Sequence, residues 1–258
     1  MNTFAESLHT AVALIAQAEH RLLEVVALSL GVSGTACLLA AGIGLAGGAA
    51  LAVASFPGRR VLLVLLNTSL ALPAVVVGLV IYLLLSRSGP LGVWGLLFTP
   101  TAMVIAQTVL VLPIVTALTR EAVESSWQVN GEQLRSLGAG RWMSGLLLLW
   151  DERLALLMVL LAAFGRAIAE VGAVMIVGGN IDGHTRVMTT AIALETSKGD
   201  LPLALALGIV LLGVVLLLNV LIAMLRGWSA RMHDGRARGG TPGDATTQGP
   251  VAAGAVGG

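Results

Sequence analysis

Long apolar runs separated by short polar stretches make up most of this chain. No charged residue occurs between Val25 and Gly58, whereas a membrane-spanning helix needs only about 20 apolar residues. Four further apolar runs follow, so the pattern predicts an all-α, polytopic membrane helix bundle with about five spans. We place the spans at Leu22–Ala54, Val61–Ser86, Val93–Leu118, Leu154–Val177 and Leu201–Leu225.

Small residues and prolines inside these spans predict local features. Gly44 and Gly48 lie four residues apart in the first span, and small residues let helix backbones approach closely. We favour packing within the chain over a dedicated dimer face for this pair. Pro73 predicts a kink in the second span, while Pro100 and Pro113 lie near the ends of the third.

The two ends of the chain differ from the spans. Residues 1–21 carry apolar positions at three- and four-residue intervals, which predicts an amphipathic helix on the outer membrane surface or, equally, a lead-in turn to the first span. They lack the basic start of a signal peptide, so we expect them to be retained. Residues 229–258 become rich in Gly, Ala and Thr and are predicted to form a disordered cytoplasmic tail.

Composition narrows the class of protein. The chain is 57% hydrophobic and 11% charged, with a mean hydropathy of +0.92, whereas soluble domains are about 45–50% apolar and about 25% charged. A lone cysteine and four scattered histidines predict neither an internal disulfide nor a metal site. The chain also lacks the Gly-x-x-x-x-Gly-Lys-Ser/Thr loop that cradles nucleotide phosphates.

The basic residues predict the orientation in the membrane. Ten arginines fall on one side of the five predicted spans, against three arginines and one lysine on the other. The side with more basic residues is expected to be cytoplasmic, which places the N-terminus outside and the C-terminus inside. The cytoplasmic set is Arg59, Arg60, Arg120, Arg135, Arg141, Arg153, Arg226, Arg231, Arg236 and Arg238.

Arg166 and Glu170 are two charges within the fourth predicted span. Each charge at bilayer depth costs roughly 2.5–3.5 kcal/mol, which a function or a mutual pairing usually offsets. The four-residue spacing puts the two side chains on one helix face. The polar stretch Gly178–Arg186 then ends the span, and a short helix is predicted over Val187–Thr196.

The run RAIAEVGAVMIVGGNIDGHTRVMTTAIALETSKGDLPLALALGI resembles the permease subunit of ATP-binding-cassette importers for molybdate, sulfate and tungstate. Its VGGNIDGHTRVMTTAIALETSKGD portion is most similar to tungstate permeases, and the resemblance extends over about Leu62–Leu225. It implies a non-enzymatic subunit that forms the path for an oxyanion, tungstate in particular, with molybdate or sulfate as alternatives. A transporter driven by an ion gradient is a competing class, although no internal repeat is visible and Glu170 is the only carboxylate in a span.

Under this resemblance the charged span belongs to the translocation path. Arg166, Glu170 and Gly172 are the predicted path or gate residues, and an ion pair that only fixes packing is the alternative. In the outer loop, Asn180, His184 and Arg186 form a second candidate set. They are expected to face an external binding protein or, alternatively, to be ordinary loop residues.

The polar interval 119–153 is predicted to be the cytoplasmic coupling loop. Its core, EQLRSLGAG from Glu132, is similar to the importer signature of Glu-Ala-Ala, three residues, then Gly. We expect a short amphipathic helix with Leu134 and Leu137 on one side, ending at a left-handed Gly138. On the residues alone a solvated helix is the simpler interpretation, whereas the resemblance favours docking onto an ATPase subunit. Three positions depart from the family pattern: Gln133, Leu134 and Asp151.

The resemblance also implies an assembly in a bacterial inner (plasma) membrane. The expected partners are a second copy of the chain, cytoplasmic ATP-binding-cassette ATPase subunits, a periplasmic oxyanion-binding protein and the lipid bilayer, but no nucleic acid. ATP and Mg would lie on the ATPase partner, and no cofactor is expected on this chain.

Overall fold

The computed structural model describes residues 3–17 and 20–238, and within these ranges the regular structure is entirely helical. The helices run in chain order as follows: α1 Thr3–Ala16, α2 His20–Val53, α3 Arg59–Leu70, α4 Ala74–Leu85, the 3₁₀ turn η1 Gly92–Trp94, α5 Pro100–Ser136, α6 Arg141–Asp151, α7 Arg153–Ile168, α8 Gly172–Gly178, α9 Met188–Lys198 and α10 Leu201–Arg238. Within the predicted segment 1–21, residues Thr3–Ala16 form α1, and the helix predicted at Val187–Thr196 is present as α9.

Five segments of the described chain have the length and composition of membrane spans when each bent pair is counted once. Helices α2, α5 and α10 are each long and apolar enough to cross a bilayer. Two helix pairs have this character only when taken together, and each is sharply bent: α3 and α4 by 102°, and α7 and α8 by 58°. The all-α, multi-span architecture predicted from the sequence is confirmed, and Pro73 lies at the first break as expected. The predicted span Leu154–Val177 consists of two helices, α7 and α8, rather than one.

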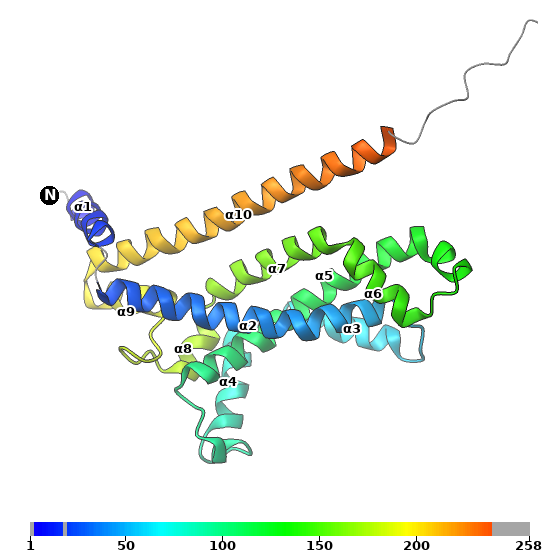
Figure 1. Cartoon of the computed structure of the whole chain (residues 1–258). Coiled ribbons are helices and arrows are strands. Elements are labelled where there is room, and N and C mark those ends of the chain that lie inside the picture. Colours follow the sequence, from blue (N-terminus) through cyan, green and yellow to red (C-terminus); the bar gives the residue numbers. More distant parts are fainter. Residues whose placement is uncertain (1–2, 18–19, 239–258) are drawn as a thin grey trace, which may run out of the picture.

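The centre of the bundle is the contact between α2 and α5, which lie side by side in Figure 1. Gly44 lies against Val115, and a Cβ on Gly48 would lie 2.7 Å from the backbone oxygen of Thr116. Only hydrogen at these positions allows so close an approach. The glycine pair therefore packs within the chain, as the sequence interpretation favoured.

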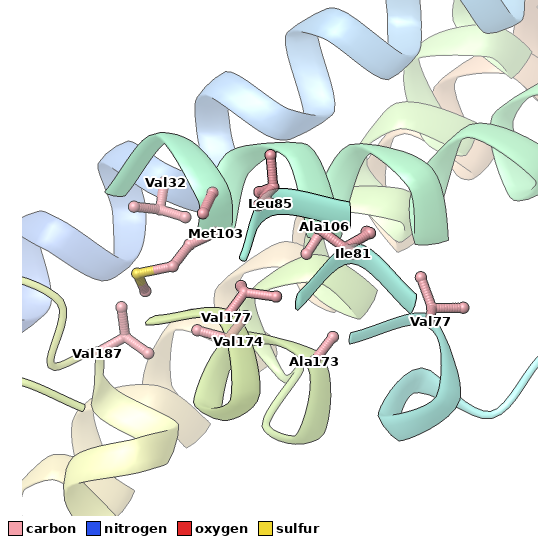
Figure 2. Close-up of a cluster of buried hydrophobic side chains, with 11 residues drawn as sticks. Val32, Val77, Ile81, Leu85, Met103, Ala106, Ala173, Val174, Val177 and Val187 are labelled. Carbon is pink, nitrogen blue, oxygen red and sulfur yellow. The ribbon is translucent and has the colours of Figure 1, made fainter. Parts of the chain in front are cut away.

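The second halves of the two broken spans pack against each other. A Cβ on Gly78 of α4 would lie 2.7 Å from the Cα of Ala173 in α8. Figure 2 shows the apolar cluster that these helices share with α2 and α5, in which Met103 and Ala106 meet Val174 and Val177. This cluster holds α4 and α8 to the first part of α5.

Helix α5 continues well beyond the apolar run that predicted it. It begins at Pro100, with Thr99 as N-cap accepting from the Ala102 amide at 3.4 Å, and ends only at Ser136. Proline suits the first helical position because its missing N–H would be unpaired there in any case. The first half of the polar interval is thus an extension of a span rather than a separate short helix.

The first helix of the described chain, α1, packs against the last, α10. Helix α1 contacts α10, and Ala11 is fully buried beside Leu207. Helix α10 runs to Arg238, so the first ten residues of the predicted tail, 229–238, are helical. Residues 239–258, together with 1–2 and 18–19, lie outside the described residues.

Candidate functional site

The fourth span breaks where its two charges lie. Helix α7 ends at Ile168 and α8 begins at Gly172, which leaves Glu170 in the connection rather than on a continuous helix. The Glu170 side chain is 6% exposed, and its Oε2 accepts a hydrogen bond from Arg166 Nη1 at 2.6 Å. Its Oε1 accepts from the amides of Gly172 at 3.0 Å and Ala173 at 3.4 Å.

These contacts satisfy the buried carboxylate and leave the cation available. A buried charge is tolerated when it is paired and hydrogen-bonded, as Glu170 is. Arg166 is about half exposed (49%) and uses one of its five N–H groups on Glu170. The arrangement therefore presents a tethered guanidinium at the surface of an apolar span, which can attract an anion.

Side chains from two other helices complete the hydrogen bonding of the break. Gln107 Nε2 of α5 donates to the Ala167 carbonyl at 2.9 Å, and Thr189 Oγ1 of α9 donates to the Glu170 carbonyl at 2.8 Å. Gln107 was missed by the sequence reasoning. The signal that could have found it is an isolated amide side chain in an apolar run.

Gly172, the third predicted path residue, lies where α8 meets α4. A Cβ at this position would lie 2.7 Å from Cγ2 of Val75. The structure thus brings Arg166, Glu170 and Gly172 together at one break, and it adds the start of α4 as their neighbour. A side chain at residue 172 would force the Val75 side chain, or the helices that carry the two residues, to shift.

The predicted coupling segment is the end of α5 and the turn after it. Glu132 and Leu134 lie in the last turn region of α5, and Gly138 has the expected left-handed conformation with φ of 78°. The amide of Gly138 donates to the Arg135 carbonyl at 2.9 Å, which closes the helix end. Leu137 is 75% exposed, whereas Leu134 is half-buried and packs within the chain. The exposed apolar side chain at the turn is therefore Leu137.

Beyond this turn, α6 carries an apolar face that the described chain leaves uncovered. Five large side chains on α6 are exposed: Trp142, Met143, Leu146, Leu147 and Trp150. Figure 1 shows α6 at the end of the bundle opposite α9.

An ion-pair cluster joins α3 to α5. Glu124 accepts from both Arg59 and Arg120, which fixes the α2–α3 turn to α5.

The outer loop is held by ion pairs. Asp182 binds Arg21 at 2.8 Å and Arg186 at 2.7 Å. The hydrogen bond from Arg21 and the nearby Arg186 charge hold the pKa of Asp182 below its ordinary value. Asn180 donates to the Thr190 carbonyl at 3.3 Å, and the Arg186 side chain is only 12% exposed. Of the three predicted loop residues, His184 is the exposed one.

The fold and this site together define a polytopic membrane protein with a charged break in one span. Among residues 3–17 and 20–238, no group of three or more His, Cys, Asp or Glu side chains is placed to hold a metal ion.

Comparisons with known proteins identify the family. The chain is 40% identical over 226 residues to the tungstate uptake system permease protein TupB of Peptoclostridium acidaminophilum, covering 88% of this chain and 99% of that protein. It is 43% identical over 210 residues to a probable anion ABC transporter permease protein of Haloferax volcanii, covering 80% and 90% of the two chains. The sulfate transport system permease protein CysT of Escherichia coli is 31% identical over 170 residues, or 63% of this chain and 61% of CysT. No protein-family model matches the chain. The chain belongs to the permease subunits of ATP-binding-cassette transporters for oxyanions.

Proposed function

We propose that this chain forms the membrane path of an ATP-driven importer for tungstate. The observation that carries the proposal is the 40% identity to a tungstate uptake permease over nearly the whole of both chains. The tethered cation Arg166 supports it, because tungstate is a divalent oxyanion and the path needs a weak attraction for it.

In the proposed assembly, two copies of the chain cross a bacterial inner membrane with their N-termini outside. Two ATPase subunits, which hold ATP and Mg, dock from the cytoplasm on the segment formed by Glu132, Leu134, Leu137 and Gly138. This chain carries no cofactor of its own. A periplasmic binding protein delivers the anion to the outer loop and meets Asn180, His184 and Arg186. The exposure of Leu137 and His184 supports these two contact surfaces.

The proposed mechanism rests on a change between two states of the path. ATP binding and hydrolysis on the partner favour one state and then the other, and each state opens the path to one side. Arg166 attracts the anion, while Glu170 keeps part of the guanidinium engaged and so prevents tight binding. Gly172 lets α4 and α8 touch at the break, which makes it the candidate gate position.

The test is uptake by vesicles that contain the assembled complex. Labelled tungstate, molybdate and sulfate are supplied with the binding protein, with ATP inside or outside the vesicles. We expect tungstate uptake that requires ATP on the ATPase side. Preferred uptake of molybdate or sulfate would overturn the substrate assignment, and uptake without nucleotide would indicate a gradient-driven transporter instead.

The role of the ion pair is tested in the same vesicles. Arg166→Ala leaves a buried carboxylate unpaired, which costs about 3–5 kcal/mol and endangers assembly. The double variant Arg166→Gln/Glu170→Gln removes both charges and avoids that problem. We expect it to assemble and to lose uptake, whereas the matched control Arg60→Ala, at an exposed arginine outside the break, keeps uptake. Full uptake by the double variant would leave the pair with a packing role only.

A further inference from the structure

Gln107 has a buried, unsatisfied acceptor on the apolar part of α5. Its side chain is 3% exposed and lies on α5 beside the broken fourth span. The Nε2 atom donates to the Ala167 carbonyl, while Oε1 is buried and has no hydrogen-bond partner in the described chain. Exchanging the two amide atoms would set Oε1 against the Ala167 carbonyl, so the hydrogen bond fixes the orientation.

The surroundings of this acceptor point to one donor. Gln107 shares a small space with Leu110, Val111, Arg166, Ala167 and Glu170. The Oε1 atom itself is buried from solvent in this state. Among these neighbours only Arg166 carries side-chain donors, and its guanidinium uses one N–H on Glu170. Buried polar atoms are rarely left unpaired, and exceptions often lie at functional positions.

We propose that Gln107 is a positioning residue of the transport path, acting through Arg166. This inference rests on the proposed function of the chain as an oxyanion permease. Through Nε2, Gln107 fixes the end of α7 that carries Arg166. Through Oε1, it supplies the second acceptor that receives the guanidinium when the path changes state and the anion must leave.

This arrangement gives the cation two resting positions. With Glu170 as its acceptor, the half-exposed guanidinium stands at the surface of the span and attracts the anion. With Oε1 of Gln107 as its acceptor, the guanidinium is withdrawn toward α5. Leaving Glu170 costs free energy because its carboxylate is buried, and the hydrogen bond to Oε1 offsets part of that cost, so Gln107 makes the movement less unfavourable. Release of the anion then limits turnover less than it would with a fixed cation.

The experiment compares two variants that each remove one hydrogen bond to the break. Gln107→Met keeps the length of the side chain and removes both amide groups, while the matched control Thr189→Val removes the bond to the Glu170 carbonyl. Both are assembled with the ATPase and binding protein, and uptake of labelled tungstate and ATP hydrolysis are measured. For Gln107→Met we expect a maximal uptake rate about tenfold lower, a KM within about twofold of the unmodified complex, and more ATP hydrolysed per anion. Thr189→Val should keep the uptake rate within about twofold.

Each outcome decides the inference. Unchanged uptake by Gln107→Met, or an equal loss in Thr189→Val, would show that Gln107 has only a structural role. Should Gln107→Met not assemble, Gln107→Glu replaces the amide by a carboxylate, which loses the Nε2 donor and holds the guanidinium more strongly, so we expect an uptake rate about tenfold lower; an assembled Gln107→Glu with unchanged uptake overturns the proposal. Failure of the unmodified complex to move any oxyanion would instead refute the proposed function.

Discussion

Replacing Gly48 by alanine tests the contact between α2 and α5. The added Cβ would lie 2.7 Å from the Thr116 carbonyl oxygen and 2.7 Å from Cβ of Thr119. Neither atom is the free end of a flexible side chain, so the helices themselves must separate. Gly42 is the matched control, because a Cβ there meets nothing within 4 Å on the same helix.

The size of the effect follows from two opposing terms. Overpacking a close contact costs about 1–3 kcal/mol. Alanine regains up to about 1 kcal/mol of helix propensity over glycine. Gly48→Ala is therefore expected to lower the free energy of unfolding by about 0–2 kcal/mol, and by about 1–3 kcal/mol relative to Gly42→Ala, which shows only the gain. At Gly44 the clash is with the Val115 side chain at 2.9 Å, so its cost should lie between these two.

The chain carries its own reporter for this measurement. Cys37 is the sole cysteine, it is 8% exposed, and it lies on α2. A maleimide that fluoresces on reaction with a thiol will label it as the detergent-solubilised protein unfolds on heating. We expect the midpoint for Gly48→Ala to lie about 2–12 °C below that for Gly42→Ala. Equal midpoints for Gly48→Ala and Gly42→Ala would refute the close approach of α2 and α5.

Three further predictions concern the ends of the spans. Gly138→Ala places a side chain at φ of 78° in open space, so we expect a local strain of about 1–2 kcal/mol at the turn. Less ATPase subunit should copurify with this variant, while its Cys37 labelling midpoint stays unchanged. Undiminished copurification would contradict this prediction. Asp182→Asn removes two ion pairs, which should speed hydrogen exchange of residues 179–186. Because Arg21 lowers the pKa of Asp182, the stabilisation that this carboxylate gives the loop is present above the ordinary pKa of 3.8 and is lost only as the pH falls through the lower folded-state value. Unmodified protein should therefore show no loss of protection from hydrogen exchange in the loop between about pH 8 and 5. A loss in that range would refute the assignment. Glu124→Gln weakens the bonds to two arginines, so we expect the free energy of unfolding to fall by about 1–2 kcal/mol and the Cys37 labelling midpoint to fall with it. An unshifted midpoint would mean that these ion pairs do not stabilise the fold.

The sequence predicted the features that depend on local chemistry. Long runs without charge gave the spans, Pro73 gave the bend of the second span, and the left-handed Gly138 followed from the helix-ending pattern around it. The sequence predicted that Gly44 and Gly48 pack within the chain, although it did not identify α5 as the partner helix. Each of these features is set by a few neighbouring residues, so a single sequence contains it.

Other features depend on contacts between distant parts of the chain. No proline marks the break at Glu170. The break is held instead by the Glu170 carboxylate, which accepts from amides of α8, and by Gln107 and Thr189, which donate to carbonyls of the break from other helices. The third span was predicted to end at Leu118, whereas helix α5 continues to Ser136, because hydropathy reports the edge of the bilayer rather than the end of a helix. Arg186 looked like a loop side chain, yet an acidic partner on each side holds it nearly buried.

Helix α5 joins the buried amide of Gln107 to the exposed turn after Ser136 without an interruption. In such a helix the number of residues between two positions fixes the rotation of one position about the helix axis relative to the other. Inserting a single residue between Gln107 and Glu132 would rotate the far end by about 100° and move it by about 1.5 Å, although every original side chain would still be present. Seven inserted residues, two nearly complete turns, would restore this rotation to within about 20° but lengthen the helix by about 10 Å. The residue count of this segment is therefore constrained more strictly than its composition.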